Sequence, residues 1–296
     1  MRSQVTPHTI PELASDLEAA LEWVSSVGFP VERGRIDDYR RILLKLNDDF
    51  DEKRWGDVSD QAQMKRLCTV LLEVREIVSI YRGLSIDSDP DGLSEFRHYV
   101  KGPFSAVDEL HKNASNKARN TGFELYLTAL CAFAKLKPTY QTDADLCFQH
   151  GDHTYFVEAK RPMFSTSMHA VIKDANKQLT RRLAGVEGGK ARGLIALDLS
   201  KVINPHDRVL PVLDAAHLDR MMNIETSERI EQLQGEWHKN RATGTVGVLL
   251  CFKLLTQFGP EGDLNTLRWI SFVKFGDYPG LADLGSRLQG VIRQIC

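Results

Sequence analysis

The spacing of apolar residues differs between the first hundred residues and the rest of the chain. In segments 12–27 and 61–81, apolar side chains recur every three or four residues, which is the period of a helix with one buried face. We therefore expect a helical N-terminal region, 1–103. The acidic hexapeptide 87–92 contains the Asp, Pro and Gly typical of a turn. It matches the start of a calcium-binding EF-hand loop but lacks the glutamate that such a loop needs at position twelve, so we interpret it as a linker.

The remainder of the chain, 104–296, mixes helical and strand patterns. Helical spacing covers 118–136, 168–184 and most of 212–240, and the apolar runs typical of strands are 191–199, 245–255 and 267–275. Between the first two of these helices, segment 139–160 alternates polar and apolar residues with a period of two. The sequence therefore predicts an α/β or α+β domain whose central sheet is flanked by helices.

The alternating segment contains a turn that fixes its register. A Gly-Asp pair at 151–152 separates two alternating runs, and such a two-residue connection is typical of a type II′ β-hairpin. With this turn, Asp145 lies opposite Glu158, and Asp143 lies opposite Lys160. Because successive side chains of a strand point to opposite faces, these four polar residues are expected to share one face of the hairpin.

The opposed acids Asp145 and Glu158 are the candidate metal ligands. Like charges directly opposite each other on paired strands repel, and a divalent cation between them would remove the repulsion. Hard oxygen ligands with no nearby His or Cys at the same end of that face favour Mg²⁺, with Mn²⁺ as a substitute. Lys160 follows Glu158 on the same face, within reach of a metal-bound water or a phosphate. The alternative is a solvent-exposed hairpin on which Glu158 and Lys160 merely pair.

A set of residues in the hairpin and its two flanking helices forms a recognisable pattern. Its members are Glu124, Asp145, Glu158, Ala159, Lys160 and Gln178. The pattern resembles the PD-(D/E)xK superfamily of restriction-endonuclease-like nucleases over about residues 115–200. The resemblance implies a restriction-endonuclease-like fold, with metal bound by Asp145, Glu158 and the carbonyl oxygen of Ala159. It also implies that Lys160 orients or activates the attacking water.

The flanking helices show how closely the resemblance holds. Glu124 matches an acidic residue that many members carry on the preceding helix, and Gln178 matches a polar residue on the following one. Two positions depart from the superfamily pattern. Ala144 stands before Asp145 where the name-giving motif has proline, and Arg182 stands four residues after Gln178 where one subgroup has tyrosine. The second departure leaves the chain outside that subgroup's pattern.

Basic residues gather around the helix predicted at 168–184. From position 161 to position 182 there is a single acid, and the basic residues are Arg161, Lys173, Lys177, Arg181 and Arg182. We refer to these five residues as the basic ridge. A basic ridge beside an acidic metal site is what holding a phosphodiester backbone requires. For any single member, an ordinary solvated helix face is an equal alternative.

Composition and charge are compatible with a nucleic-acid partner. The 296 residues carry a net charge of −2, but the first hundred have −6, residues 101–200 have +4 and the rest have 0. The five cysteines show no C-x-x-C spacing, which argues against a disulfide framework or a zinc site. No apolar run is long enough to cross a membrane. We expect a cytoplasmic protein without a membrane partner.

The sequence thus predicts a Mg²⁺-dependent endonuclease that hydrolyses phosphodiester bonds, with DNA as the favoured partner and restriction, phage defence or repair as the setting. Two alternatives stay open. One is an RNA-directed nuclease of a defence or toxin system, and the other is a nucleic-acid-binding protein that keeps the fold without cutting. The helical N-terminal region is expected to be regulatory, or to bind a partner protein or a second copy of the chain.

Overall fold

A computed structural model gives the arrangement of the chain. The residues that it describes are 9–51, 61–85, 94–110, 115–139, 144–186, 189–239, 241–258 and 264–295. The predicted linker at 87–92 and the predicted position of Asp143 lie outside the described residues.

The described part of the N-terminal region is helical, as its periodicity predicts. Its helices are α1 (Ile10–Ser26), α2 (Arg35–Asp51), α3 (Gln61–Leu84) and the single turn α5 (Phe96–Tyr99). Helix α1 begins with a capping box, in which the Thr9 hydroxyl accepts from the Glu12 N–H at 3.3 Å and the Thr9 N–H donates to the Glu12 carboxylate at 2.9 Å. These bonds satisfy two backbone donors that a helix start leaves free.

After the N-terminal region, helices and strands are interspersed along the chain. The helices are α6 (Lys117–Phe133), α7 (Met168–Ala184), α8 (Ser200–Ile203), α9 (Ala215–Lys239) and α10 (Leu281–Ile295), with 3₁₀ turns η2 (Val107–Leu110) and η3 (Ser165–Ser167). The strands are β1 (Pro138–Thr139), β2 (Leu146–His150), β3 (His153–Lys160), β4 (Ala191–Asp198), β5 (Val209–Val212), β6 (Thr245–Phe258) and β7 (Leu264–Lys274). The chain is therefore mixed α/β, as predicted.

The strands form one mixed sheet with the order β1-β2-β3-β4-β6-β5, and β7 also pairs with β6. Strands β1, β2 and β3 are antiparallel neighbours, whereas β3 is parallel to β4 and β4 is parallel to β6. Parallel neighbours need a crossover connection, and α7 supplies it between β3 and β4. The long strand β6 pairs with β4 through its first half and with β5 through its second half.

The predicted hairpin register is confirmed. Leu146 pairs with Val157 and His150 pairs with His153, around the turn at 151–152. Alternation then directs Leu146, Val157 and their like to one face, where they join the hydrophobic core. Glu158 is directed to the opposite face, toward α7. The register therefore sets the position of the candidate site residues.

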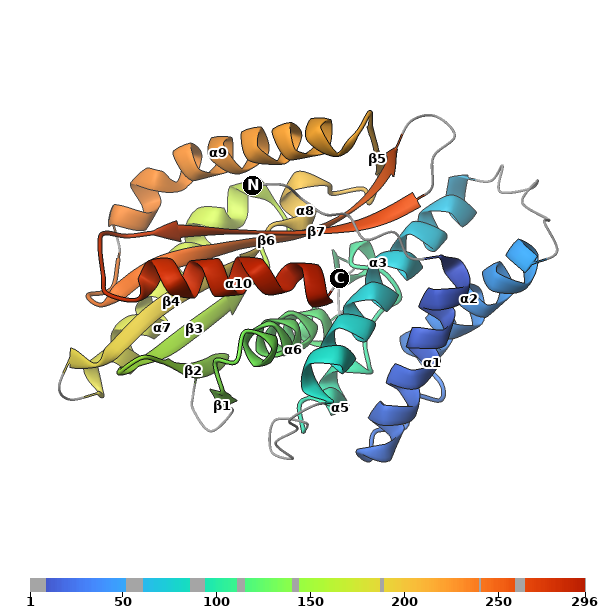
Figure 1. Ribbon diagram of the computed structural model, residues 1–296, viewed down its shortest axis with the longest axis horizontal. Helices are drawn as coiled ribbons and strands as arrows, with labels where there is room; N and C mark the ends of the chain where they lie inside the picture. The colour runs from blue at the N-terminus through green and yellow to red at the C-terminus, as the bar shows by residue number, and fades with distance from the viewer. Residues whose placement is uncertain are drawn as a thin grey trace.

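Helices cover both faces of the sheet. Figure 1 shows α9 on one side of β6 and β7, and α10 and α6 on the other. One hydrophobic cluster joins α6, α10 and one sheet face, and a second joins α7, α9 and the other face. The first cluster also contains the buried leucines and valines of α1 and α3. The core therefore runs across the predicted boundary at residue 103, while the division into two domains stays a prediction.

Close packing of α3 on α6 explains part of this continuity. A side chain at Gly83 of α3 would collide with the backbone of Ala129 in α6, and one at Gly122 of α6 would collide with the ring of Tyr99. Glycine thus lets α6 approach α3 at the first point and α5 at the second. Within the described ranges, no helix is long and apolar enough to cross a membrane.

Candidate active site

Asp145 is held in place by the backbone of the opposite strand. It lies just before β2, and its Oδ2 accepts a hydrogen bond from the N–H of Ala159 at 2.8 Å. The carboxylate thus binds the strand that carries Glu158 and Lys160, which fixes the distance between the two sides of the hairpin. About a quarter of the Asp145 side chain remains exposed (24%), so this carboxylate faces solvent at the end of the sheet.

The ammonium of Lys160 gathers three of the predicted site residues. Its Nζ donates to Gln178 Oε1 at 2.6 Å and to Glu158 Oε2 at 3.2 Å, and it lies 3.6 Å from Asp145 Oδ2. Gln178 projects from α7, so the crossover helix contributes directly to the site. The two carboxylates lie within reach of one ammonium, which means that a single cation can contact both.

Glu158 is the most buried member of the site, with no exposed side-chain area. Besides Lys160, it forms an ion pair through Oε1 with the guanidinium of Arg182 on α7. A buried carboxylate without a partner would be costly, and the two cations provide the compensation. The sequence places Arg182 on the basic ridge, whereas the structure directs it into the site.

Glu124 of α6 lies within electrostatic reach of the same cluster. Burial, followed by the negative charge of Asp145, raises the pKa of Glu124 to about 7, and the charge of Lys160 acts in the opposite direction. At neutral pH this carboxyl group is therefore only partly ionised. The structure brings Asp145, Glu158, Lys160 and Gln178 into contact, with Glu124 within electrostatic reach, and their catalytic role stays a prediction.

The oxygen donors suit a hard divalent cation. Asp145 and Glu158 offer carboxylates from the two sides of the hairpin, and Ala159 between them offers a backbone carbonyl. In the described part of the chain, no group of three His, Cys, Asp or Glu side chains is arranged to hold a metal. Mg²⁺ commonly takes only one or two protein carboxylates and keeps several waters, so the donor set present fits it.

Three members of the basic ridge lie on the surface. Lys173, Lys177 and Arg181 are exposed on α7, one turn apart from each other. Arg182, by contrast, is 17% exposed and contacts Glu158. The exposed ridge is therefore shorter than the sequence suggests. It lies on the helix whose Gln178 and Arg182 reach the acidic site.

The structure corrects the prediction that Arg161 belongs to the basic ridge. Its side chain is only 7% exposed, and its Nε donates to Asp198 Oδ2 at 3.2 Å. It also donates to Asn120 at 3.1 Å and lies 3.6 Å from Glu109. Because its side chain is buried and its Nε and Nη1 are bonded inside the protein, Arg161 is a structural residue, and we remove it from the predicted nucleic-acid contacts.

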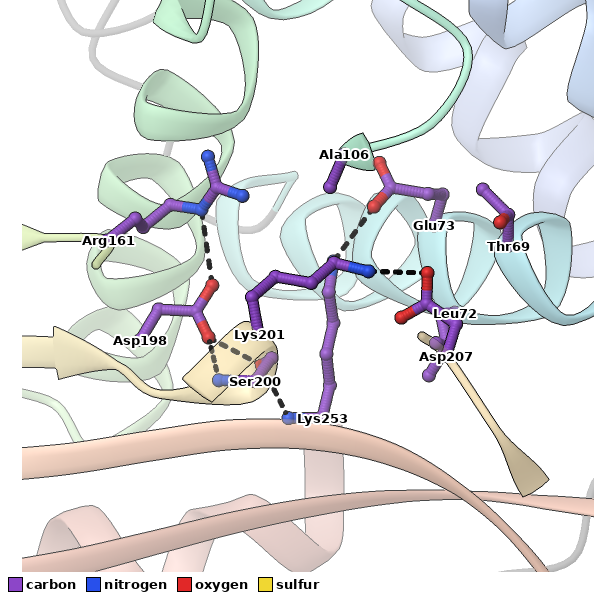
Figure 2. Close-up of a pocket in the computed structure, with 10 residues that line it drawn as sticks. All are labelled: Thr69, Leu72, Glu73, Ala106, Arg161, Asp198, Ser200, Lys201, Asp207 and Lys253. Carbon is purple, nitrogen blue, oxygen red and sulfur yellow. Dashed lines mark hydrogen bonds and ion pairs between the residues drawn. The ribbon is translucent and has the colours of Figure 1, made fainter. Parts of the chain in front are cut away.

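A buried charged cavity lies behind Arg161, and sequence reasoning did not find it. Figure 2 shows Arg161 paired with Asp198, and Lys201 paired with Asp207, in a lining to which Ser200 and Lys253 also belong. The cavity has a volume of about 20 Å³, which is room for about one water. Its lining comes from α3, β4, α8 and β6, together with the loop just before η2 and the loops after β3 and α8.

Two acids of this cavity are held ionised by their neighbours. Burial alone raises the pKa of Asp198, but the charges of Arg161 and Lys253 and the hydrogen bonds from Ser200 outweigh it, so the pKa is lowered. Glu73 on α3 accepts from Lys253 Nζ at 3.1 Å. The signal in the sequence is a lysine at 253 inside an apolar strand, because a buried charge needs a partner.

Comparison with models of protein families, with curated proteins and with solved structures finds no match to this chain.

Proposed function

We propose that this protein is a metal-dependent nuclease that hydrolyses phosphodiester bonds, with DNA as substrate. The observation that carries the proposal is the position of the Lys160 ammonium. It lies between Asp145 and Glu158 and donates to Gln178 on the crossover helix. An acid pair, a lysine and a glutamine at one end of a hairpin are the parts that the PD-(D/E)xK resemblance requires.

The connection of the elements supports a restriction-endonuclease-like fold as part of the same proposal. A helix, α6, precedes the hairpin β2-β3, and a second helix, α7, crosses over to the parallel strand β4. Each of these elements carries or supports one of the candidate residues. Restriction, phage defence and repair in the cytoplasm are settings in which such an activity is used.

Each residue has a separate role in the proposed reaction. Asp145, Glu158 and the carbonyl oxygen of Ala159 would hold Mg²⁺, which supplies a Lewis acid and lowers the pKa of a bound water. Lys160 donates hydrogen bonds toward the reacting phosphate, where negative charge increases in the transition state. Gln178 fixes the direction of the lysine. Lys173, Lys177 and Arg181 bind the neighbouring phosphates.

A cleavage assay tests this function. Plasmid DNA, linear DNA, single-stranded DNA and RNA are incubated with the protein in Mg²⁺, in Mn²⁺ or in EDTA. We expect DNA to be cut only with metal, and Asp145→Asn, Glu158→Gln and Lys160→Ala each to slow cutting by about a hundredfold or more. The matched control is Asp152→Asn, which changes an exposed acid at the turn of the same hairpin.

The outcomes separate the alternatives. Cutting of RNA alone would replace DNA with RNA as the substrate, in line with the acidic N-terminal region. Cutting in EDTA, or wild-type rates in folded Glu158→Gln, would contradict the metal-dependent site. Binding of nucleic acid without any cutting would favour the non-cutting alternative.

A further inference from the structure

Both carboxylate oxygens of Glu158 face cations that belong to the chain itself. Oε2 accepts from Lys160 at 3.2 Å, and Oε1 forms the ion pair with Arg182. Two acids, Asp145 and Glu158, are thereby matched by two basic groups. A divalent cation that approaches Glu158 meets the positive charge of the guanidinium, and in a buried site this repulsion is weakly screened.

Arg182 differs from Lys160 in how it is held. Lys160 has three oxygen atoms around its ammonium, contributed by both strands of the hairpin and by α7. Arg182 is in the last turn of α7 and is 17% exposed, next to the exposed Arg181. Its side chain therefore lies at the border between the buried site and the surface where the ridge would bind phosphates.

An arginine in this position has two competing partners of the same chemistry. A guanidinium pairs with the two oxygens of a carboxylate or with the two oxygens of a phosphate. A rotation of the long side chain from Glu158 toward solvent would exchange one partner for the other, because α7 also carries the exposed ridge residues Lys173, Lys177 and Arg181. Departure of Arg182 frees Glu158 Oε1 for a metal ion.

We propose that Arg182 is a positioning residue that competes with the metal for Glu158 and transfers to a phosphate when nucleic acid binds, so that nucleic acid and metal strengthen each other's binding. This inference rests on the proposed function. Coupling of this kind is reciprocal, because whatever factor nucleic acid adds to metal affinity, metal adds to nucleic-acid affinity. Metal without substrate would then bind weakly, which limits hydrolysis away from a bound backbone.

Metal titration of the full chain tests the competition directly. MnCl₂ is titrated by calorimetry into wild type, Arg182→Gln, Arg182→Lys and the matched control Lys190→Gln, all without nucleic acid. We expect Arg182→Gln to bind Mn²⁺ about tenfold more tightly than wild type, since one positive charge beside the site is lost. Arg182→Lys, which retains the charge, should stay close to wild type. Lys190→Gln removes the same charge from an exposed position just before β4, at the end of the strand away from Lys160, and should leave the Mn²⁺ affinity unchanged.

A second titration measures the coupling. The same four proteins bind Mn²⁺ in the presence of a short DNA duplex with phosphorothioate linkages, which slows cutting. We expect the duplex to tighten Mn²⁺ binding in wild type and in Lys190→Gln, and the tightening factor to fall about tenfold in Arg182→Gln. A residue that merely supports the fold would weaken metal binding when it is removed, so the predicted increase separates the two roles.

The outcomes keep this inference apart from the proposed function. If wild type binds Mn²⁺ and cuts DNA, but folded Arg182→Gln and Arg182→Lys bind Mn²⁺ no differently from each other and no more tightly than wild type, the competition is wrong and the nuclease stands. If wild type neither binds Mn²⁺ nor cuts, the proposed function fails, and the inference fails with it. Circular dichroism and thermal melting establish that each variant is folded, and Arg182→Lys provides the comparison should the glutamine variant lose stability.

Discussion

Lys160 can be oriented only as well as its partners hold it, and Gln178 is the closest of them at 2.6 Å. We expect Gln178→Met, which keeps the length of the side chain but removes the acceptor, to lower the single-turnover rate of cutting about tenfold. Substrate affinity should change little, because Gln178 acts through the lysine. The measurement is single-turnover cleavage at saturating DNA, with Asp152→Asn as the control. A change confined to affinity would place Gln178 in substrate binding instead.

The side chains of the hairpin were predictable because two local rules fix them. The Gly-Asp turn sets the register of the hairpin, and the period of two sets the face to which each side chain points. The positions of Asp145, Glu158 and Lys160 therefore follow from the sequence alone. Arg181 and Arg182 were not separable in the same way. Adjacent helix residues point about 100° apart, and which one turns inward depends on how α7 rotates against β3 and β4.

At the scale of elements, buried charges connect α3 to the sheet. Glu73 forms ion pairs with Arg35, Arg119 and Lys253, and Glu76 forms ion pairs with Lys253 and Arg268. Periodicity predicts α3 and β6, and shows a lysine inside an apolar strand, but it does not show that they meet. Glu73 and Lys253 are 180 residues apart along the chain, so only the fold brings them together.

This connection predicts that Glu73 stabilises the fold. Glu73→Gln removes the charge that balances three buried cations and should lower the free energy of unfolding by about 3–5 kcal/mol. Glu18→Gln is the matched control, because Glu18 pairs with Arg40 and its own side chain is 34% exposed. The loss of this exposed pair should cost less than about 1 kcal/mol. Urea denaturation at pH 7 measures both. Equal costs for the two variants would show that the buried network contributes little.

The stability difference between wild type and Glu73→Gln should depend on pH. Burial raises the pKa of Glu73, but the charges of Arg119, Lys253 and Arg35 outweigh burial and hold the pKa well below its usual 4.5. The carboxylate is therefore ionised in the folded protein at pH values where it is protonated in the unfolded chain. Its stabilisation is complete above about pH 5.5 and is lost as pH falls below about 4.5. The difference in unfolding free energy between wild type and Glu73→Gln should shrink in acid; a constant difference would contradict the assignment.

Helix α7 gives a third prediction at this scale, through the exposed part of the ridge. Lys173→Ala combined with Lys177→Ala should weaken binding to DNA of any sequence and reduce the slope of log affinity against log salt by about two. Binding is measured by fluorescence anisotropy over a range of salt concentrations. Lys239→Ala with Lys274→Ala removes the same charge from exposed positions elsewhere and should leave the slope unchanged. An unaltered slope in the ridge variant would return both lysines to an ordinary solvated face.

For the whole molecule, the charge imbalance along the sequence acquires a different meaning. The first hundred residues carry −6 and the next hundred carry +4, which suggests an acidic unit that repels nucleic acid beside a basic unit that binds it. Part of that charge is internal, however. Glu73 and Glu76 from the first group are buried against Arg119, Lys253 and Arg268. The acids of the N-terminal region therefore also join the two regions, and net charge per segment does not measure surface charge.

This joining leads to a prediction about truncation. Removal of residues 1–103 would expose the face of α6 that packs on α3, including Ala129, and would leave Arg119 without Glu73. We expect the fragment 104–296 to be poorly soluble or to melt without a cooperative transition, whereas the full chain should unfold in one transition. Circular dichroism and differential scanning calorimetry of both proteins are the measurements. A soluble fragment with a sharp transition that still cuts DNA would instead establish 104–296 as an independent nuclease domain, with the N-terminal helices as a separable regulatory part.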